Sequence, residues 1–466
     1  MSVLYPAREI ARITQGELRG TRNEAAPLEG VCIDSRKVEK GSLFVALPGT
    51  RTDGHEFLEQ AAANGAAGLL VRRAWWRRRG ERLERQGLCR EAAVIAVDDP
   101  LEALQRLAAH HLLRFPAVTR VGVTGSNGKT TTKEIIGGIL AQTAPTVKSR
   151  GNLNSEIGLP LVALGVTKDT RFAVFEMATN HPGEMEVLAD IVRPNLALIT
   201  NIGSAHIEFF GSREAIAEEK KQIFRFFGER DTGFLFEREP FFRHLAEGVQ
   251  GEILPFGPES TTGYGGSRDL GLDGTAIDWE GLQIHFPLFG EHNLMNALGA
   301  VTLCRTVGVD REAVKAGLER VEPIFARSRV IRGPVTIVED CYNANPDSMK
   351  TVLGYFDALG WDGRKLAVLG NMLELGDESR RAHVGIALLA VRLSLDRCVF
   401  YGEGWAAAAA VFEQPAAKAR CVWTSDFDTL LHILSCSVEP GDLIVLKGSR
   451  GARLERLVDP LKRIAA

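Results

Sequence analysis

Residues 119–134, TRVGVTGSNGKTTTKE, carry the strongest structural signal in this chain. An apolar run of strand length leads into a glycine-rich turn, and residues that favour a helix follow the turn. Glycines let the backbone turn tightly enough to point its N–H groups at phosphate oxygens, and the N-terminus of the following helix adds partial positive charge. The order of strand, glycine-rich loop and helix therefore predicts a nucleotide-binding domain built on a parallel sheet.

The polar residues of this loop suit the phosphates of ATP and a magnesium ion. Lys129 supplies a point charge for the β- and γ-phosphates, and Thr130 offers a hydroxyl to Mg²⁺. A general P-loop has a glycine five residues before its second glycine, where this chain has Val123, so we expect a shorter variant of the loop. The alternative is a glycine-rich turn without a ligand, which the run G-x-x-G-K-T-T disfavours. The predicted ATP-binding residues of the loop are Thr124, Gly125, Ser126, Asn127, Gly128, Lys129, Thr130 and Thr131.

Short apolar runs alternate with helical stretches along the chain, a pattern that predicts an α/β fold with parallel sheets and right-handed crossovers. The runs fall into three groups, and the chain length also favours about three domains. We place the domains at 1–99, 100–322 and 323–466, and we expect loops and short strands in the Gly-rich stretch 255–282. The expected strands are 42–47, 66–71, 93–97, 119–123, 172–176, 196–200, 335–339, 366–370, 398–402 and 443–448, and the expected helices include 55–66, 130–142 and 213–226.

The composition is that of an ordinary globular protein, with 45% hydrophobic and 25% charged residues among 466. The net charge of -3 gives no argument for nucleic acid or a membrane as a partner. The seven cysteines are scattered and form no C-x-x-C pair, which argues against a disulfide framework and a zinc site and fits a reducing cytoplasm. We expect a cytoplasmic protein without a signal peptide or a membrane span.

Arginines crowd the segment 72–90, RRAWWRRRGERLERQGLCR. A nucleic-acid patch is one interpretation. Glu81 and Glu84 alternate with the arginines, however, and the chain as a whole is not basic. We therefore expect a solvated amphipathic segment whose tryptophans pack inward.

Three polar side chains follow predicted strands of the central domain, at the sheet edge where ligands collect in parallel α/β folds. Glu176 ends the run FAVFE and offers the hard oxygen that Mg²⁺ prefers. His206 lies just past LALIT, and its residue type alone favours a packed histidine over a metal ligand. Lys220 follows in EAIAEEKKQIF, where an ordinary surface lysine is the simplest interpretation.

Together these residues resemble the Mur ligase family, the ATP-dependent amide ligases of peptidoglycan precursor synthesis. The family loop T-G-(S/T)-x-G-K-(T/S) is similar to TGSNGKT at 124–130. The resemblance implies that Glu176 and His206 bind Mg²⁺ together with Thr130, and that Lys220 is carbamylated and bridges metal ions. It also implies catalytic roles for Lys129, His206 and Lys220.

Further segments similar to the family imply how the substrates are held. In GEHNLMNALGA Asn293 would hold the adenine of ATP, in FARSRV Arg327 would contact a phosphate, and in EDCYNANPDSM Asp340 would take the ribose. The implied fold is a central P-loop domain flanked by an N-terminal UDP-binding α/β domain and a C-terminal Rossmann-like domain. The implied substrate-binding residues are Ser35, Arg36, Asp53, Gly54 and His55 for the UDP end, with Asn152, Asn154, Asn343 and Asn345.

The resemblance implies that ATP phosphorylates the terminal carboxylate of a UDP-N-acetylmuramoyl-tripeptide, and that the amine of D-alanyl-D-alanine then attacks. We expect a monomer. Ligases of the family that add the third amino acid usually carry D-N-P-R, where this chain reads NANP. Ala178 and Asn371 stand where glycine and aspartate are usual. The alternatives are a tripeptide-forming ligase, a folylpolyglutamate synthase of the same architecture, or a P-loop ATPase that makes no amide bond.

Overall fold

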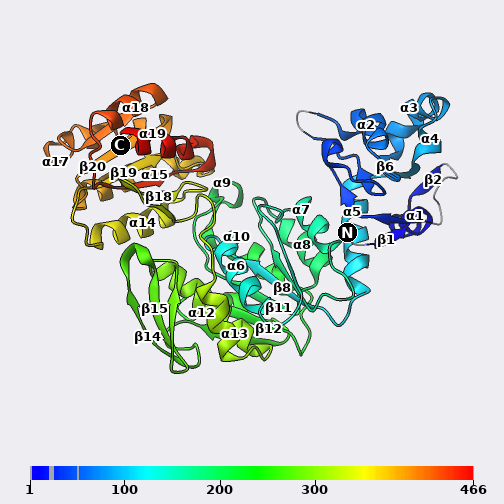
Figure 1. Cartoon of the computed structure of the whole chain (residues 1–466), viewed down its shortest axis with the longest axis horizontal. Helices are drawn as coiled ribbons and strands as arrows, with labels where there is room; N and C mark the ends of the chain where they lie inside the picture. The colour runs from blue at the N-terminus through cyan, green and yellow to red at the C-terminus, as the bar shows by residue number, and fades with distance from the viewer. Residues whose placement is uncertain (1–2, 20–25, 50–51, 465–466) are drawn as a thin grey trace.

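The computed structural model describes residues 3–19, 26–49 and 52–464, which form three α/β units in chain order (Figure 1). The central unit lies between the first and the last. Residues 50 and 51, which precede the predicted substrate-binding residues Asp53, Gly54 and His55, lie outside the described residues. The three main sheets confirm the expected α/β class.

The first unit contains a five-stranded sheet in the order β2 (Glu17–Arg19), β7 (Ala93–Val97), β6 (Gly68–Arg72), β5 (Leu43–Val45) and β4 (Val31–Cys32). The three predicted apolar runs form its parallel centre, whereas β2 pairs antiparallel with β7 at the edge. The helix expected over 55–66 is shorter. It begins as a 3-10 turn, because the Asp53 side chain accepts the N–H of His55, and α2 spans only Leu58–Ala63.

The arginine-rich segment forms the helix α3 (Arg73–Arg85) on the outside of the first unit. Trp76 and Leu83 of this helix are buried, while most of its arginines are exposed. This confirms the amphipathic interpretation of the segment.

The helix α5 (Pro100–Leu113) joins the first unit to the central one. Asp99 caps its N-terminus, with Oδ1 accepting the N–H of Leu101 at 2.7 Å. The helix packs against α1 (Ala7–Thr14) of the first unit and against α7 (Gly158–Ala163) and α8 (Glu184–Val192) of the central unit. The helix α5 therefore packs against both units and joins them.

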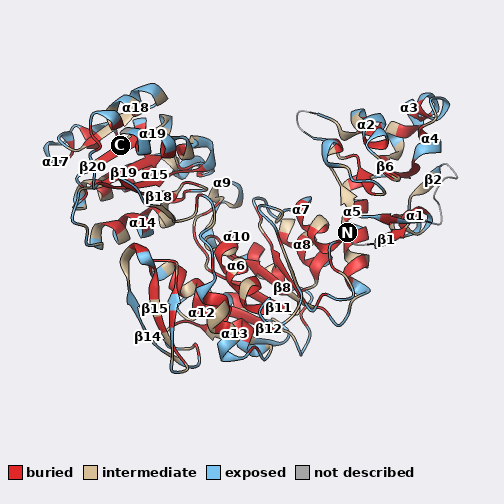
Figure 2. Ribbon diagram, viewed as in Figure 1, coloured by how far each residue is buried: buried red, intermediate tan, exposed pale blue. Residues whose placement is uncertain are grey.

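The central unit is a six-stranded, fully parallel sheet in the order β13 (Glu252–Phe256), β12 (Thr232–Phe236), β11 (Leu196–Ile199), β8 (Thr119–Thr124), β10 (Phe172–Glu176) and β9 (Thr146–Lys148). Helices α5, α7 and α8 cover one face, and α6 (Lys129–Leu140), α12 (Glu291–Thr306) and α13 (Arg311–Glu319) cover the other. Burial on both faces explains why the strands read as continuous apolar runs (Figure 2). The helix expected over 213–226 ends earlier, with α10 at Arg213–Lys221.

The Gly-rich stretch forms short strands, as expected. They are β14 (Tyr264–Asp269), β15 (Thr275–Trp279) and β16 (Leu282–Phe286), and they build a separate antiparallel sheet. Trp279 and Phe286 are buried in the same core as α12 and α13. The small sheet is thereby attached to the central unit.

The last unit is a six-stranded sheet in the order β17 (Arg329–Ile331), β18 (Thr336–Asp340), β22 (Leu443–Lys447), β19 (Lys365–Gly370), β20 (Arg397–Tyr401) and β21 (Cys421–Thr424). All pairs are parallel except β17 with β18. Helices α14 (Pro346–Ala358) and α15 (Ser379–Arg392) cover one face, and α18 (Phe427–Ser435) and α19 (Val458–Ile464) lie on the other. All four predicted apolar runs are strands of this sheet. Across the described residues, no helix has the length and apolar character to cross a membrane.

The crossing of α13 over α6 depends on a glycine. A Cβ added to Gly317 would lie 2.5 Å from the Cα of Ile139. We therefore expect Gly317→Ala to lower the free energy of unfolding by about 1–3 kcal/mol, because backbone must shift to admit the methyl group. Denaturant unfolding measures the effect. The matched control is Gly354→Ala on α14, where a Cβ meets nothing within 4 Å, and this change should leave stability equal or higher. Equal stability of both variants would contradict the packing described here.

Candidate active site

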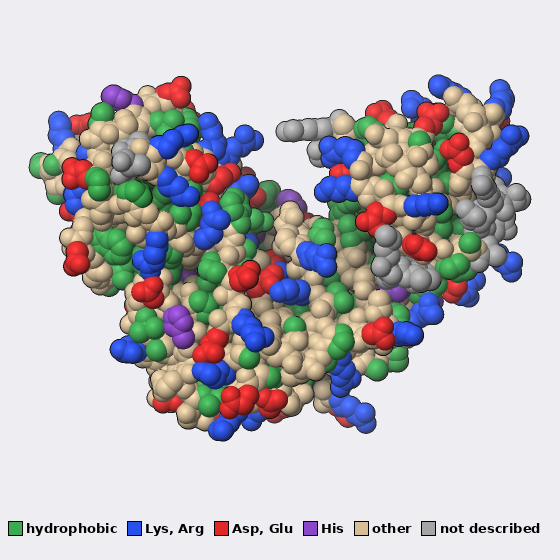
Figure 3. All heavy atoms as spheres, in the orientation of Figure 1, with side chains coloured by type: hydrophobic (Ala, Val, Ile, Leu, Met, Phe, Trp, Pro, Cys, Tyr) green, Lys and Arg blue, Asp and Glu red, His purple; other side chains and the backbone are tan. Residues whose placement is uncertain are grey.

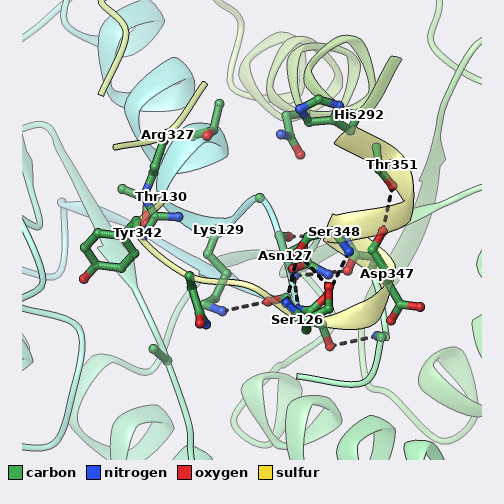
Figure 4. A pocket seen from close by; sticks show the side chains of 18 of the residues that line it. Ser126, Asn127, Lys129, Thr130, His292, Arg327, Tyr342, Asp347, Ser348 and Thr351 are labelled. Carbon is green, nitrogen blue, oxygen red and sulfur yellow. Dashed lines mark hydrogen bonds between the residues drawn. The ribbon is translucent and has the colours of Figure 1, made fainter. Parts of the chain in front are cut away.

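A cavity of about 550 Å³ opens between the central and last units, at the carboxyl ends of the strands in the central sheet (Figure 4). The phosphate loop after β8 forms its floor, and segments from α12, β18 and α14 close it from the other side. The predicted residues that line it are Ser126, Asn127, Gly128, Lys129, Thr130, Thr131, Asn152, Asn154, Glu176, His206, Asn293, Arg327, Asp340, Asn343 and Asn345.

Two glycines of the loop are needed both for the backbone conformation of the turn and because neighbouring side chains leave no room for a Cβ. Gly125 and Gly128 have φ angles of 141° and 81°. A Cβ on Gly128 would lie 2.5 Å from Oδ1 of Asn296, and one on Gly125 would lie 1.9 Å from Oγ1 of Thr200. Thr124 and Gly125 lie at the base of the loop and do not line the cavity wall. The turn lets α6 start at Lys129 with its free N–H groups toward the cavity.

The Lys129 side chain folds back over the loop. Its Nζ donates to the carbonyl oxygens of Gly125 at 2.9 Å and Ser126 at 3.3 Å. Burial is the main reason why the pKa of Lys129 is lowered to about 8; the Glu176 carboxylate opposes this shift and the nearby Arg327 guanidinium adds to it. An anion at the loop would relieve this unfavourable burial of positive charge.

Glu176 ends β10 beside the loop, and its carboxylate has one free oxygen. Oε1 accepts the hydroxyl of Thr130 and the amide of Asn154, each at 2.9 Å. Oε2 is buried without a hydrogen-bond partner. A carboxylate oxygen beside a threonine hydroxyl fits Mg²⁺, which takes few protein ligands and completes its shell with phosphates and water. Within the described ranges, no group of three or more His, Cys, Asp or Glu side chains could hold a metal without such help.

His206 and Lys220 take different places. His206 lies in the cavity wall, and its Nδ1 is 2.6 Å from Oε2 of Glu374 in the last unit. Lys220 lies on α10 behind the wall, buried, with its Nζ 3.5 Å from the Thr179 hydroxyl. Burial, together with the charge of Lys129, lowers the pKa of Lys220 to about 7. Lys220 is therefore not the surface lysine that residue type alone suggests, whereas Lys221 is only half-buried.

The last unit brings a cation and an acid to the cavity. Arg327 lies with its guanidinium 4.1 Å above the ring of Tyr342, and its neighbours Ala326 and Ser328 both have positive φ angles (57° and 52°). Asp340 pairs with Lys447 at 3.1 Å and accepts the N–H of Ser328 at 3.1 Å. Figure 4 shows Arg327 and Tyr342 on one side of the cavity and His292 on the other.

The predicted amides have partners inside the protein. Asn293 donates to the carbonyl of Phe289 at 2.8 Å. Asn345 caps α14, accepting the N–H of Ser348 at 2.9 Å, and its Nδ2 donates to Oδ1 of Asn127 at 2.8 Å. The Asn345 side chain thus ties the last unit directly to the phosphate loop.

The predicted UDP-binding residues lie in the first unit, away from this cavity. Ser35 donates to Gln60 at 2.8 Å, and Arg36 makes a two-bond contact with Asp34 that holds the pKa of that carboxyl at about 2. Gly54 starts the 3-10 turn that Asp53 caps. Figure 3 shows open space between the first and last units, on one face of the central unit.

His55 is buried, and both of its ring nitrogens are engaged. Its Nδ1 lies 2.6 Å from Oδ1 of Asp53, and its Nε2 accepts the N–H of Arg72 at 2.9 Å. The ring also stacks on Trp75 with 5.0 Å between centroids. This arrangement gives His55 a part in shaping the loop that carries Asp53 and Gly54.

Comparisons with known proteins agree over the whole chain. Residues 27–112 match the Mur ligase family catalytic domain, 123–304 the Mur ligase middle domain and 326–450 the Mur ligase glutamate ligase domain. The chain is 36% identical to UDP-N-acetylmuramoyl-tripeptide–D-alanyl-D-alanine ligase from Treponema pallidum, covering 98% of each chain. It belongs to the Mur ligase family. The ligase of the same name from Bacillus subtilis is also 36% identical, over 97% of each chain.

Solved structures of Mur ligases have the same fold as this chain. A crystal structure of MurF from Acinetobacter baumannii superposes with a TM-score of 0.86 at 29% identity, covering 99% of this chain and 100% of the other. MurF ligase from Thermotoga maritima in complex with ADP gives a TM-score of 0.77 at 28% identity, covering 94% of this chain and 97% of the other. The architecture is therefore that of a three-domain Mur ligase.

Several polar residues of this Mur ligase site were missed by sequence reasoning. Asn201 follows β11 and makes two hydrogen bonds with the backbone of Asn127. Its Oδ1 accepts the N–H of Asn127 and its Nδ2 donates to the carbonyl oxygen of Asn127, each at 3.1 Å. Its position after a predicted strand was the available signal. Asp347 accepts both the N–H and the hydroxyl of Ser204 at 2.9 Å, a contact across 143 positions that no local pattern encodes. Other unpredicted lining residues include Asn180, Glu184, Arg213, His292, Asn296, Tyr342 and Lys447.

Proposed function

We propose that this Mur ligase joins D-alanyl-D-alanine to UDP-N-acetylmuramoyl-tripeptide and converts ATP to ADP and phosphate. The observation that carries the proposal is the meeting of the phosphate loop, Glu176 and the last unit at one cavity, in a chain similar to ligases of that name from end to end. Such a ligase acts in peptidoglycan precursor synthesis.

The proposed reaction has two steps. A carboxylate oxygen of the tripeptide attacks the γ-phosphorus of ATP, the bond to the β-phosphate breaks, and ADP leaves. The amine of D-alanyl-D-alanine, having lost a proton, then attacks the carbon of the acyl phosphate. The carbon–oxygen bond breaks, inorganic phosphate leaves, and an amide remains. Positioning and charge stabilisation carry most of the catalysis in phosphoryl transfer.

This chain's own residues hold the nucleotide. The loop N–H groups and Lys129 would bind the β- and γ-phosphates, and Arg327, which lines the same cavity close enough to act on the charge of Lys129, would add a further phosphate contact. Asn293 would face the adenine and Asp340 the ribose. ATP would replace the internal bonds of Lys129 with contacts to phosphate oxygens, which offsets the cost of burying that cation.

Thr130, Glu176 and His206 are the residues that would hold Mg²⁺. When bound there, the ion would neutralise charge on the transferring phosphoryl group. We infer a carbamate on Lys220 as a further part of the site. Lys220 is buried, makes no ion pair among the described residues, and has a pKa near neutrality, so the neutral amine that reacts with CO₂ is accessible.

The first unit would hold the UDP end through Ser35, Arg36 and the loop at Asp53 and Gly54, shaped by His55. The remaining substrate contacts would come from Asn152, Asn154, Asn343 and Asn345 at the cavity. We place the domains at 1–99, 100–322 and 323–466, with α5 as the first helix of the second. We further propose a cytoplasmic monomer.

We expect Arg36→Ala to raise the KM for the UDP-linked tripeptide about tenfold and to leave the KM for ATP within twofold. Arg36 is exposed and lies in the first unit, outside the ATP cavity, so its loss should affect only the acceptor. Steady-state kinetics with each substrate varied in turn measures both constants. The matched control is Arg85→Ala, since Arg85 is equally exposed (79%) and also pairs with a carboxylate. Equal effects on both KM values would refute this role for Arg36.

A panel of substrates tests the proposed function. Product should form with UDP-N-acetylmuramoyl-tripeptide and D-alanyl-D-alanine together with ATP, and not when either is left out. Coupling of a single amino acid to a UDP-linked dipeptide would instead identify a tripeptide-forming ligase. Glutamate addition to a folate would identify a folylpolyglutamate synthase. Phosphate release without any acceptor would identify an ATPase.

A further inference from the structure

We propose that Glu374 is a positioning residue for His206, so that docking of the last unit on the central unit completes the metal side of the site. The inference rests on the proposed function, because it takes His206 as a ligand of Mg²⁺. Glu374 lies 168 positions after His206 in a different sheet unit, so no local sequence pattern predicts the contact between the two side chains.

The contact itself is a short ion-pair distance between the two units. Nδ1 of His206 lies 2.6 Å from Oε2 of Glu374, although the approach is not aligned for a hydrogen bond. A carboxylate at Nδ1 stabilises the tautomer with the proton on that nitrogen and leaves Nε2 free for a metal ion. It also restricts rotation of the imidazole. Glu374 can therefore decide which nitrogen His206 presents to the cavity.

The backbone at both residues is unusual. His206 has a φ of 60° and Glu374 a φ of 61°, so both residues occupy the left-handed region that rarely suits a side chain. Strained residues of this kind gather at functional sites, where the surrounding structure holds them in place. Here two such residues from separate units face each other.

The segment that carries Glu374 has a rigid base in the last unit. The N–H of Met372 donates to Nε2 of His383 at 3.2 Å, and the N–H of Leu373 donates to Oγ of Ser449 at 3.0 Å. The backbone just before Glu374 is thus held in place by hydrogen bonds to the last unit, as a positioning role requires.

Two further contacts cross the same boundary. Asn345 bonds Asn127 in the phosphate loop, and Asp347 bonds Ser204, two residues before His206. All these contacts join the last unit to the central one, so movement of the last unit away from the cavity would break them together. Metal affinity should then depend on docking through Glu374.

The test measures Mn²⁺ binding by electron paramagnetic resonance, in full-length protein with a non-hydrolysable ATP analogue. We expect Glu374→Ala to weaken Mn²⁺ binding about tenfold and Glu374→Gln, which keeps an oxygen but loses the charge, to weaken it less. Asp377→Asn is the matched control, because Asp377 is an exposed acid of the same segment. The Glu374 carboxylate is 44% exposed, and so exposed a pair adds little to stability. The melting temperature should therefore not change.

Wild-type Mn²⁺ affinity in Glu374→Ala would overturn the inference, as would an equal loss in Asp377→Asn. Coupling is measured in parallel, and we expect kcat to fall while the KM for D-alanyl-D-alanine stays within twofold. Failure of the wild-type enzyme to couple its substrates would refute the proposed function. Normal wild-type coupling with unaffected Mn²⁺ binding in Glu374→Ala would refute only the role of Glu374.

Discussion

Lys129→Ala should lower the rate of coupling by about a hundredfold to a thousandfold, while the protein still folds. The side chain supplies positive charge where the phosphoryl group is transferred, and loss of one such group typically costs two to three orders of magnitude. Stability should not suffer, because the buried cation already has a pKa lowered to about 8 and its removal relieves a burial cost. Single-turnover product formation and thermal unfolding measure the two effects.

The control for this variant is Lys350→Ala, which removes an exposed lysine of α14 that does not line the cavity. It should couple at the wild-type rate. A folded Lys129→Ala enzyme with wild-type turnover would show that the loop at 124–131 is not the phosphate site.

Lys220→Ala should lose most of its activity, by about tenfold to a hundredfold. A free ammonium near bound Mg²⁺ would be repelled by it, whereas a carbamate brings negative charge and two oxygens that suit a hard cation. Acetate or formate in the buffer should restore part of the activity, because either acid can place a carboxylate in the space that the side chain leaves.

Lys221→Ala is the matched control, since it is the neighbouring lysine on the same helix and is only half-buried. It should have little effect, with or without acetate. Full activity of Lys220→Ala would end the carbamate proposal, and so would loss of activity in Lys221→Ala alone. The ligase assignment would survive either result, because it depends on the phosphate loop, Glu176 and the similarity to named ligases.

The strands of the three sheets were predictable where burial on both faces produces continuous apolar runs. Three strands of the central unit's sheet were missed: β9 has only three residues, and Gly233 and Pro255 interrupt the short sequences of β12 and β13. The antiparallel edges β2 and β17 were also missed. The direction of an edge strand depends on which strand it pairs with in the folded protein. The hydrophobic period and the composition of the sequence do not encode this pairing.

The loop residues and Glu176 were predictable because their chemistry is local: a glycine-rich turn, a lysine and an acid at a strand end. Contacts between units were not. Asn345 was expected to bind substrate, and the structure shows its side chain bonded to Asn127 and to its own helix. The interpretation of His55 as a ligand residue likewise took no account of Arg72 and Asp53, which engage its ring only after folding.

The central claim is that this chain makes an amide through an acyl phosphate. Its most direct test uses UDP-N-acetylmuramoyl-tripeptide labelled with ¹⁸O in the terminal carboxylate, with ATP and D-alanyl-D-alanine, and mass analysis of the phosphate released. Attack of the carboxylate on the γ-phosphorus transfers one labelled oxygen, so each phosphate formed during coupling should carry one ¹⁸O from a fully labelled carboxylate. Release of unlabelled phosphate would show that water, and not the carboxylate, attacks ATP, and would contradict the account.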